Sequence, residues 1–140
     1  MIACSALYDG TCQPECSALF ARHGYAPLRP YLADAEGAAL LDAYATKALD
    51  EVALLMGRAD AEKAAGEPWV ICCHAVYTNR LALALGQALG LPAAQCDVPL
   101  DTNLRETDGF VVSEAGIARL SDIAAAHWER EGGGAGASSA

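Results

Sequence analysis

"PWVICCHAVYTNRLALALGQALG", residues 68–90, holds the pattern that indicates a fold class for this 140-residue chain. It opens with a continuous apolar run bounded by a proline, which is typical of a strand covered on both faces. A polar turn with His74 follows, and leucines and alanines then continue as a helix, with Thr78 or Asn79 as its cap and Gly90 at its end. A buried strand, a tight turn and a helix in this order indicate the α/β class.

The segments on either side fit an alternation of strands and helices. Upstream, we expect a short strand at residues 2–7, a helix at 14–23 that Gly24 ends, a loop at 27–37 and an amphipathic helix at 38–58. Downstream, we expect short strands at 96–100, 103–107 and 110–112, a helix at 120–128 and a disordered tail at 131–140. Trp69 and Trp128 are expected to anchor the core. The prediction is one domain over residues 1–130, a layered α/β/α domain with a mainly parallel sheet.

The composition limits the classes of partner. Nine basic against eighteen acidic residues give a formal charge of −9, which argues against nucleic acid and anionic membrane as partners. No apolar run approaches the ~20 residues of a membrane span, and the first residues show no cationic segment of a secretory signal. The six cysteines form no disulfide framework. We therefore expect a soluble protein of a reducing compartment.

His74 is the first candidate functional residue. It follows the expected strand and opens a helix, where open α/β sheets bind ligands and where free backbone N–H groups suit a phosphate. The alternative is a histidine hydrogen-bonded into a turn. A metal or thiol site at Cys72-Cys73-His74 is disfavoured because adjacent residues on a strand point to opposite faces. We predict no metal and no cofactor.

Three segments resemble the histidine phosphatases, the phosphoglycerate mutase-like superfamily. "VICCHAVYTNRLALALGQALGLP", residues 70–92, is similar to the segment that carries the second catalytic histidine of the family. "ACSALYDGTCQPECSALFARHGY", residues 3–25, resembles its strand-turn-helix, and "TNLRETDGFVVSEAGIARLSDIAAAHW", residues 102–128, its closing strands and last helix. The resemblance implies phosphoryl transfer to a first histidine. Two arginines and the second histidine would hold the phosphate, and a carboxylic acid would protonate the leaving group.

The chain departs from this family at the residues that carry the chemistry. His74 matches the second histidine, but the strand with the nucleophile and its arginine is missing, so the chain resembles a shortened family member. Asp9 stands at the position of the second arginine, where a carboxylate would repel a phosphate dianion. Loss of one preorganised charge-stabilising group typically costs about 10²–10³ in rate. Ordinary phosphatase chemistry is therefore expected to be abolished.

The tripeptide Arg22-His23-Gly24 spells the nucleophile motif of the family at another place. In this chain the tripeptide ends the helix of the segment at residues 3–25. The family motif instead ends a strand that precedes that segment. We therefore interpret Arg22-His23-Gly24 as a decoy. The minority interpretation keeps Arg22 and His23 as a true catalytic turn. Asp34 and Glu36, in the expected loop, are candidate proton donors, although loop carboxylates are usually only solvated.

These observations predict a catalytically degenerate histidine phosphatase-like protein that acts as a binding or assembly module. The alternative is an active phosphomonoester phosphatase or mutase-like enzyme whose nucleophile strand lies in a longer chain. The predicted partners are a phosphate-containing small molecule at the His74 turn and a second copy or another protein. Such a partner would cover the apolar surface that the missing strand leaves.

Overall fold

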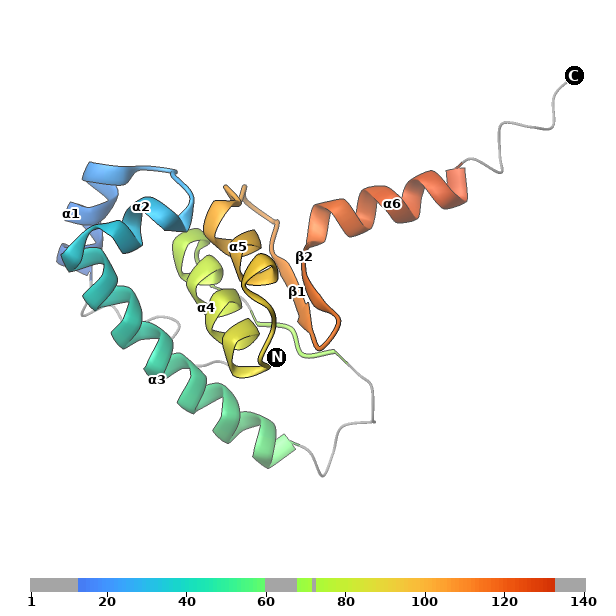
Figure 1. The fold of residues 1–140 in the computed structure, drawn as a ribbon, viewed down its shortest axis with the longest axis horizontal. Coiled ribbons are helices and arrows are strands. Elements are labelled where there is room, and N and C mark those ends of the chain that lie inside the picture. The colour runs from blue at the N-terminus through green and yellow to red at the C-terminus, as the bar shows by residue number, and fades with distance from the viewer. Residues whose placement is uncertain (1–12, 60–67, 72, 133–140) are drawn as a thin grey trace, which may run out of the picture.

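The computed structural model describes residues 13–59, 68–71 and 73–132 of the chain. Within these ranges the chain forms six helices and one two-stranded antiparallel sheet (Figure 1). In chain order they are α1 (Gln13–His23), α2 (Leu28–Ala33), α3 (Ala35–Ala59), α4 (Ala75–Ala88), α5 (Ala93–Asp101), β1 (Phe110–Ser113), β2 (Gly116–Arg119) and α6 (Leu120–Gly132).

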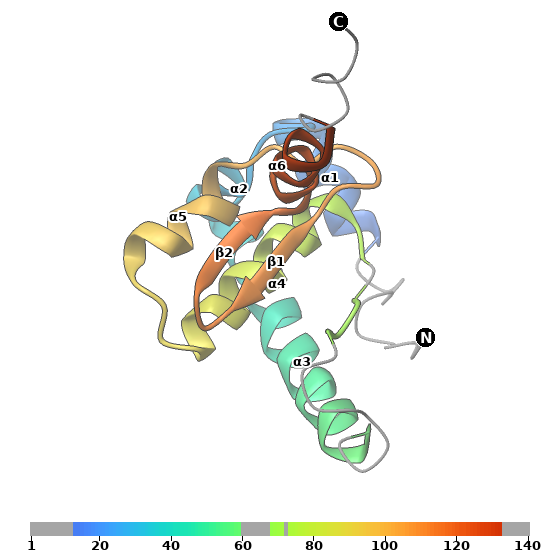
Figure 2. The same ribbon diagram turned by 90° about the vertical axis from the view of Figure 1, so that its right-hand side faces the viewer.

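The predicted layered α/β/α domain with a mainly parallel sheet is wrong. The described chain is mostly helical, and its sheet is a single hairpin. Helix α4 is the central element, with α3 and α5 beside it and the hairpin packed across it (Figures 1 and 2). Four consecutive α4 residues, 81–84, are buried. A helix that is apolar on all sides is buried on all sides, so α4 takes the central place that the prediction gave to a sheet.

The apolar run at residues 68–73 does not form the predicted strand. Ile71 and Cys73 pack against the core cluster of Ala48 and Leu81, between α3 and α4. Val70 is 82% exposed. The described part of this run lies on helices and joins no hydrogen-bonded ladder. The run is apolar because part of it packs on the core cluster, and not because it is covered on both faces as a buried strand would be.

Three further predictions are wrong, two strands and one loop. Residues 96–100 belong to helix α5, and 103–107 form no strand. In α5, Asp97 and Asp101 are one helical turn apart, and Arg29 of α2 binds both, at 3.2 and 2.7 Å. The expected loop at 27–37 contains α2 and the start of α3. At this junction a Cβ on Gly37 would collide with the Tyr31 carbonyl oxygen, so only glycine allows α3 to start so close to α2.

Five predicted elements are confirmed, among them the helix before Gly90, which corresponds to α4, and one strand was missed. The helices predicted at 14–23, 38–58 and 120–128 correspond to α1, α3 and α6, and the strand at 110–112 corresponds to β1. Gly24 follows α1 with φ of +59°, the left-handed cap predicted for it. The missed strand is β2, which pairs with β1 through Val112 opposite Ile117. Ile117 is buried against Gly86 of α4, where the lack of a side chain leaves room for it.

Helix α6 projects from the rest of the described chain (Figure 1). None of its residues is buried, and Trp128, expected in the core, is 72% exposed. Asp108 holds the start of the helix by accepting hydrogen bonds from the backbone N–H of Ser121 at 3.0 Å and from its hydroxyl at 2.9 Å. None of the helices in the described ranges is long and apolar enough to cross a membrane. The strand predicted at residues 2–7 and nearly all of the predicted tail lie outside the described residues.

Candidate functional site

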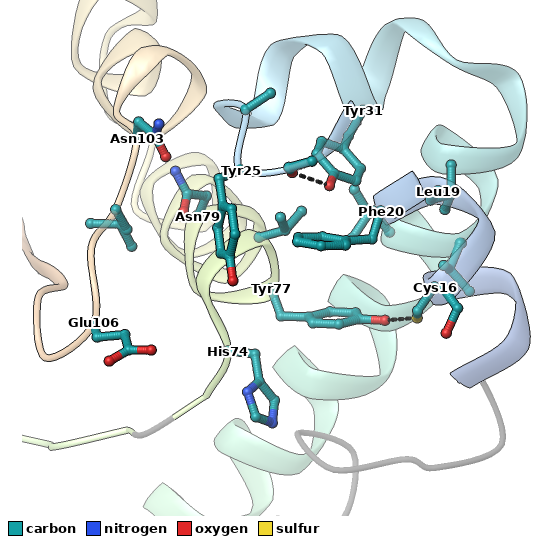
Figure 3. Close-up of a pocket in the computed structure, with 17 residues that line it drawn as sticks. Cys16, Leu19, Phe20, Tyr25, Tyr31, His74, Tyr77, Asn79, Asn103 and Glu106 are labelled. Atoms are coloured by element: carbon teal, nitrogen blue, oxygen red, sulfur yellow. Dashed lines mark hydrogen bonds between the residues drawn. The ribbon is translucent and has the colours of Figure 1, made fainter. Parts of the chain in front are cut away.

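A cavity of about 620 Å³ lies between five parts of the described chain (Figure 3). These are α1, the α1–α2 loop with the adjoining part of α2, α3, the start of α4, and the loop after α5. Pockets for small molecules in proteins commonly measure about 300–1,000 Å³. The volume is therefore sufficient for a ligand of a few fused or linked rings.

Aromatic side chains form much of the cavity wall. Phe20, Tyr25, Tyr31 and Tyr77 all line it, so that three of the five tyrosines of the chain meet at one place. The rings of Phe20 and Tyr25 meet edge to face, with centroids 5.0 Å apart. Tyr25 is 77% exposed, and its hydroxyl points toward the side of the cavity where His74 lies in the view of Figure 3. A solvent-exposed aromatic ring beside a cavity is a natural contact surface for a ligand.

Two of these tyrosines are fixed in place by their hydroxyl groups. The Tyr31 hydroxyl donates a hydrogen bond to the Gly24 carbonyl oxygen at 2.6 Å, and burial raises the pKa of this hydroxyl. The Tyr77 hydroxyl is hydrogen-bonded to the Cys16 thiol, and its ring packs on Tyr44 with centroids 4.5 Å apart. The cavity wall is thus largely preorganised, which lowers the entropic cost of binding.

Asn79 positions the loop on the far side of the cavity. This buried α4 residue donates two hydrogen bonds of 2.8 Å, to the carbonyl oxygens of Pro99 and Thr102. Both acceptors lie where α5 ends, so the amide fixes the exit of the chain from that helix. The next residues carry Asn103, Leu104 and Glu106 to the cavity (Figure 3).

His74 lies at the N-cap position of α4 and lines the cavity, as an exposed residue. Its carbonyl oxygen accepts hydrogen bonds from the Thr78 backbone N–H at 2.7 Å and from the Thr78 hydroxyl at 2.8 Å. The helix predicted after the His74 turn is therefore present, but it begins earlier than predicted, and the described residues before it form no strand. Thr78 and Asn79, the predicted caps, are both inside the helix.

The other sequence candidates form a separate cluster of charges. Arg22 Nε lies 2.9 Å from Asp34 Oδ2, Arg22 Nη2 lies 2.8 Å from Glu36 Oε2, and His23 Nε2 lies 2.9 Å from Asp34 Oδ2. The hydrogen bonds from His23 and Arg22 hold the pKa of the Asp34 carboxyl well below its usual range. Asp34 Oδ1 also accepts from the Glu36 backbone N–H at 3.0 Å, which caps the start of α3.

The structure thus brings Arg22, His23, Asp34 and Glu36 together in one cluster, whereas His74 lines the cavity. None of the four is among the described residues that line the cavity. Their bonds join the end of α1 to the start of α3, which is a structural role. Asp9 and Cys72 lie outside the described residues. In the part of the chain that the structure covers, no group of His, Cys, Asp and Glu side chains is arranged to hold a metal ion.

Sequence reasoning missed the residues that define the cavity. Tyr25, Tyr77 and Glu106 come from three separate parts of the chain, and no local motif links them. The available signal was compositional: few aromatic residues, 6% of the chain, most of them tyrosine. Tyrosine suits such a wall because it combines an apolar ring with a polar end.

Comparison with known proteins identifies no relative: the chain matches no protein-family model, no curated protein and no solved structure. The histidine phosphatase resemblance accordingly stays a prediction from sequence.

Proposed function

We propose that this protein is a binding module without catalytic activity, which takes a small molecule with an apolar or aromatic body into the cavity beside α4. The observation that carries the proposal is the cavity itself, about 620 Å³ in volume and walled by four aromatic rings. Hydrogen bonds hold two of these rings, and the exposed ring of Tyr25 is open to a ligand. Binding sites of this kind are mostly apolar, with a few polar groups that orient the ligand.

The surroundings of His74 give no support to phosphoryl transfer. Transfer of a phosphoryl group needs cations around the phosphate and a nucleophile in line with it. No lysine or arginine is found among the described cavity-lining residues, and Glu106 adds a carboxylate. His23, the minority candidate for the nucleophile, is engaged with Asp34 instead. The active phosphatase and the phosphate-containing ligand both stay predictions from sequence, and the cavity favours neither.

Binding is tested by titration of the ¹⁵N-labelled protein with indole, a neutral aromatic probe. We expect amide shifts at the cavity, in Tyr25, Tyr77 and Leu104, that saturate at millimolar indole. Tyr25→Ala should weaken binding about fivefold, because an aromatic contact contributes roughly 1 kcal/mol. Trp128→Ala removes an equally exposed ring from α6, outside the cavity, and is the matched control. Shifts that are scattered, or equal losses in both variants, would contradict the proposal.

The absence of catalysis has its own test. p-Nitrophenyl phosphate should be hydrolysed no faster with the protein present than with buffer alone, and His74→Ala should change nothing. Activity that His74→Ala abolishes would instead support the phosphatase alternative.

The predicted self-association has a surface to be tested. Three exposed apolar residues lie at positions i, i+3 and i+8 of α6, which is the spacing of an apolar helix face. They are Leu120, Ile123 and Trp128, which are 46, 40 and 72% exposed. We expect sedimentation velocity at micromolar concentration to show a species larger than the monomer, which Trp128→Ala should reduce. A strictly monomeric wild-type chain would end the assembly part of the prediction.

A further inference from the structure

We infer that the ligand of this cavity is a small organic cation, an amine or quaternary ammonium carried on an apolar or aromatic body. The inference rests on the proposed binding function and adds the charge of the ligand. It comes from the ionisable groups that line the cavity and from the way the rest of the structure uses its arginines.

Glu106 supplies the negative charge at the cavity. It lines the wall from the loop after α5, on the same side as His74 in the close-up (Figure 3). Within the described residues, no ion pair or hydrogen bond engages its carboxylate. Arg105, its neighbour in sequence, is exposed and is not part of the wall. A ligand cation would therefore meet a carboxylate that has no competing partner in this part of the chain.

Several arginines in the described residues are paired with aspartates away from the cavity. Four of them bind aspartates at the junctions between elements: Arg22 with Asp34, Arg29 with Asp97 and Asp101, Arg80 with Asp42, and Arg119 with Asp108. These pairs hold the four guanidinium groups against aspartates, and none of the four arginines is among the described residues that line the cavity. The described cavity wall thus has a carboxylate and contains no lysine or arginine.

The aromatic wall favours the same charge. The face of a tyrosine or phenylalanine ring attracts a cation within about 6 Å, and a cation is attracted more strongly where water is excluded. Phe20, Tyr25 and Tyr77 give three such rings around one space. The formal charge of −9 on the chain adds a long-range field that draws cations and repels anions.

The test compares three probes that share one body and differ in charge: 4-phenylbutylammonium, 4-phenyl-1-butanol and 4-phenylbutyrate at pH 7. Dissociation constants come from amide-shift titrations of the full chain at low salt. We expect the ammonium to bind three- to tenfold more tightly than the alcohol, and the carboxylate to bind most weakly. Glu106→Gln should bring the ammonium within twofold of the alcohol and leave the alcohol unchanged. Glu114→Gln, in the exposed turn between β1 and β2 and outside the wall, is the matched control.

The outcomes separate the inference from the function on which it rests. Equal binding of the ammonium and the alcohol, both weakened by Tyr25→Ala, would support the binding module and overturn the inference that the ligand is a cation. Tightest binding of the carboxylate would also overturn it and would favour the anionic ligand expected from sequence. A charge preference that Glu106→Gln and Glu114→Gln reduce equally would refute the role of Glu106. No binding of any probe at 10 mM would overturn the proposed function together with the inference.

Discussion

Asn79→Ala is the substitution that most directly tests how the cavity is built. The Asn79 side chain is buried in α4, and its amide nitrogen donates to the carbonyl oxygens of Pro99 and Thr102, both at 2.8 Å. Alanine removes both bonds and cannot replace either donor. The two carbonyl groups at the end of α5 then lose their partner inside the protein.

The expected cost follows from these two bonds. One buried hydrogen bond contributes about 1 kcal/mol net, and a buried polar group left without a partner costs about 1–3 kcal/mol. The small cavity left by the lost amide adds to this. We expect the free energy of unfolding to fall by about 2–3 kcal/mol, which is a large part of the roughly 5–15 kcal/mol typical of a domain.

Urea denaturation followed by far-UV circular dichroism measures this change. With a slope of about 1.5 kcal/mol per molar urea, the midpoint should fall by about 1.3–2 M. Asn103→Ala is the matched control, because Asn103 also lines the cavity but is exposed, and it should change stability by less than about 0.5 kcal/mol. Asn79→Asp keeps the shape without the donor and should be at least as destabilising as alanine. A midpoint shift below 0.3 M for Asn79→Ala, or equal shifts in Asn79→Ala and Asn103→Ala, would refute this account of the loop.

Three other predictions address the rest of the fold. The hydrogen bonds from His23 and Arg22 lower the pKa of Asp34 in the folded chain, so the Asp34 carboxylate stabilises the fold above its ordinary pKa of 3.8, and this contribution is lost as pH falls below that value. Urea midpoints measured between pH 5 and 2 should therefore fall less steeply with decreasing pH in Asp34→Asn than in the wild type. Gly37→Ala should lower the thermal midpoint through the collision with the Tyr31 carbonyl, at a cost of about 1–3 kcal/mol, and an unchanged midpoint would contradict the close approach. A chain that ends at Ile123 keeps the Ser121 bonds to Asp108 and should keep the thermal midpoint within about 2 °C, because no residue of α6 is buried.

The sequence predicts this structure well where a signal is local. Residues 38–58 show apolar positions at three- and four-residue spacing, and α3 (Ala35–Ala59) forms there. Gly24 was predicted to end α1 and does so with a left-handed φ of +59°. Both signals depend only on residues close together in sequence. The helix and its end are therefore predictable without knowledge of the tertiary contacts.

The failures occur where a short apolar run fits either type of element. Cys96, Val98 and Leu100 alternate as in a strand, yet they lie in α5, which begins after Pro92 with the helix formers Ala93 and Ala94. Arg29, about seventy residues earlier, binds Asp97 and Asp101 across one turn of that helix, at 3.2 and 2.7 Å. Such a pairing has no trace in the local pattern, so tertiary context decides between strand and helix here.

The candidate site also has one part that the sequence predicts and another part that it does not. His74 was predicted from its place before a helix, and it does line the cavity at the start of α4. Its neighbours there, Tyr25 and Glu106, are 49 and 32 residues away in sequence and are brought together only by packing. A single histidine at a helix start was therefore visible from sequence, whereas the surroundings that set its chemistry were not.

The surroundings also change what that histidine implies. A helix start with an imidazole suits an anion only where positive charge accompanies it, since a phosphate dianion beside a carboxylate is repelled. In the described chain four arginines, Arg22, Arg29, Arg80 and Arg119, pair with aspartates away from the cavity, and Glu106 is the acidic group among the described wall residues. The same helix start that by resemblance predicted a phosphate site therefore stands, in this arrangement, beside aromatic rings and a carboxylate, which favour a ligand of the opposite charge.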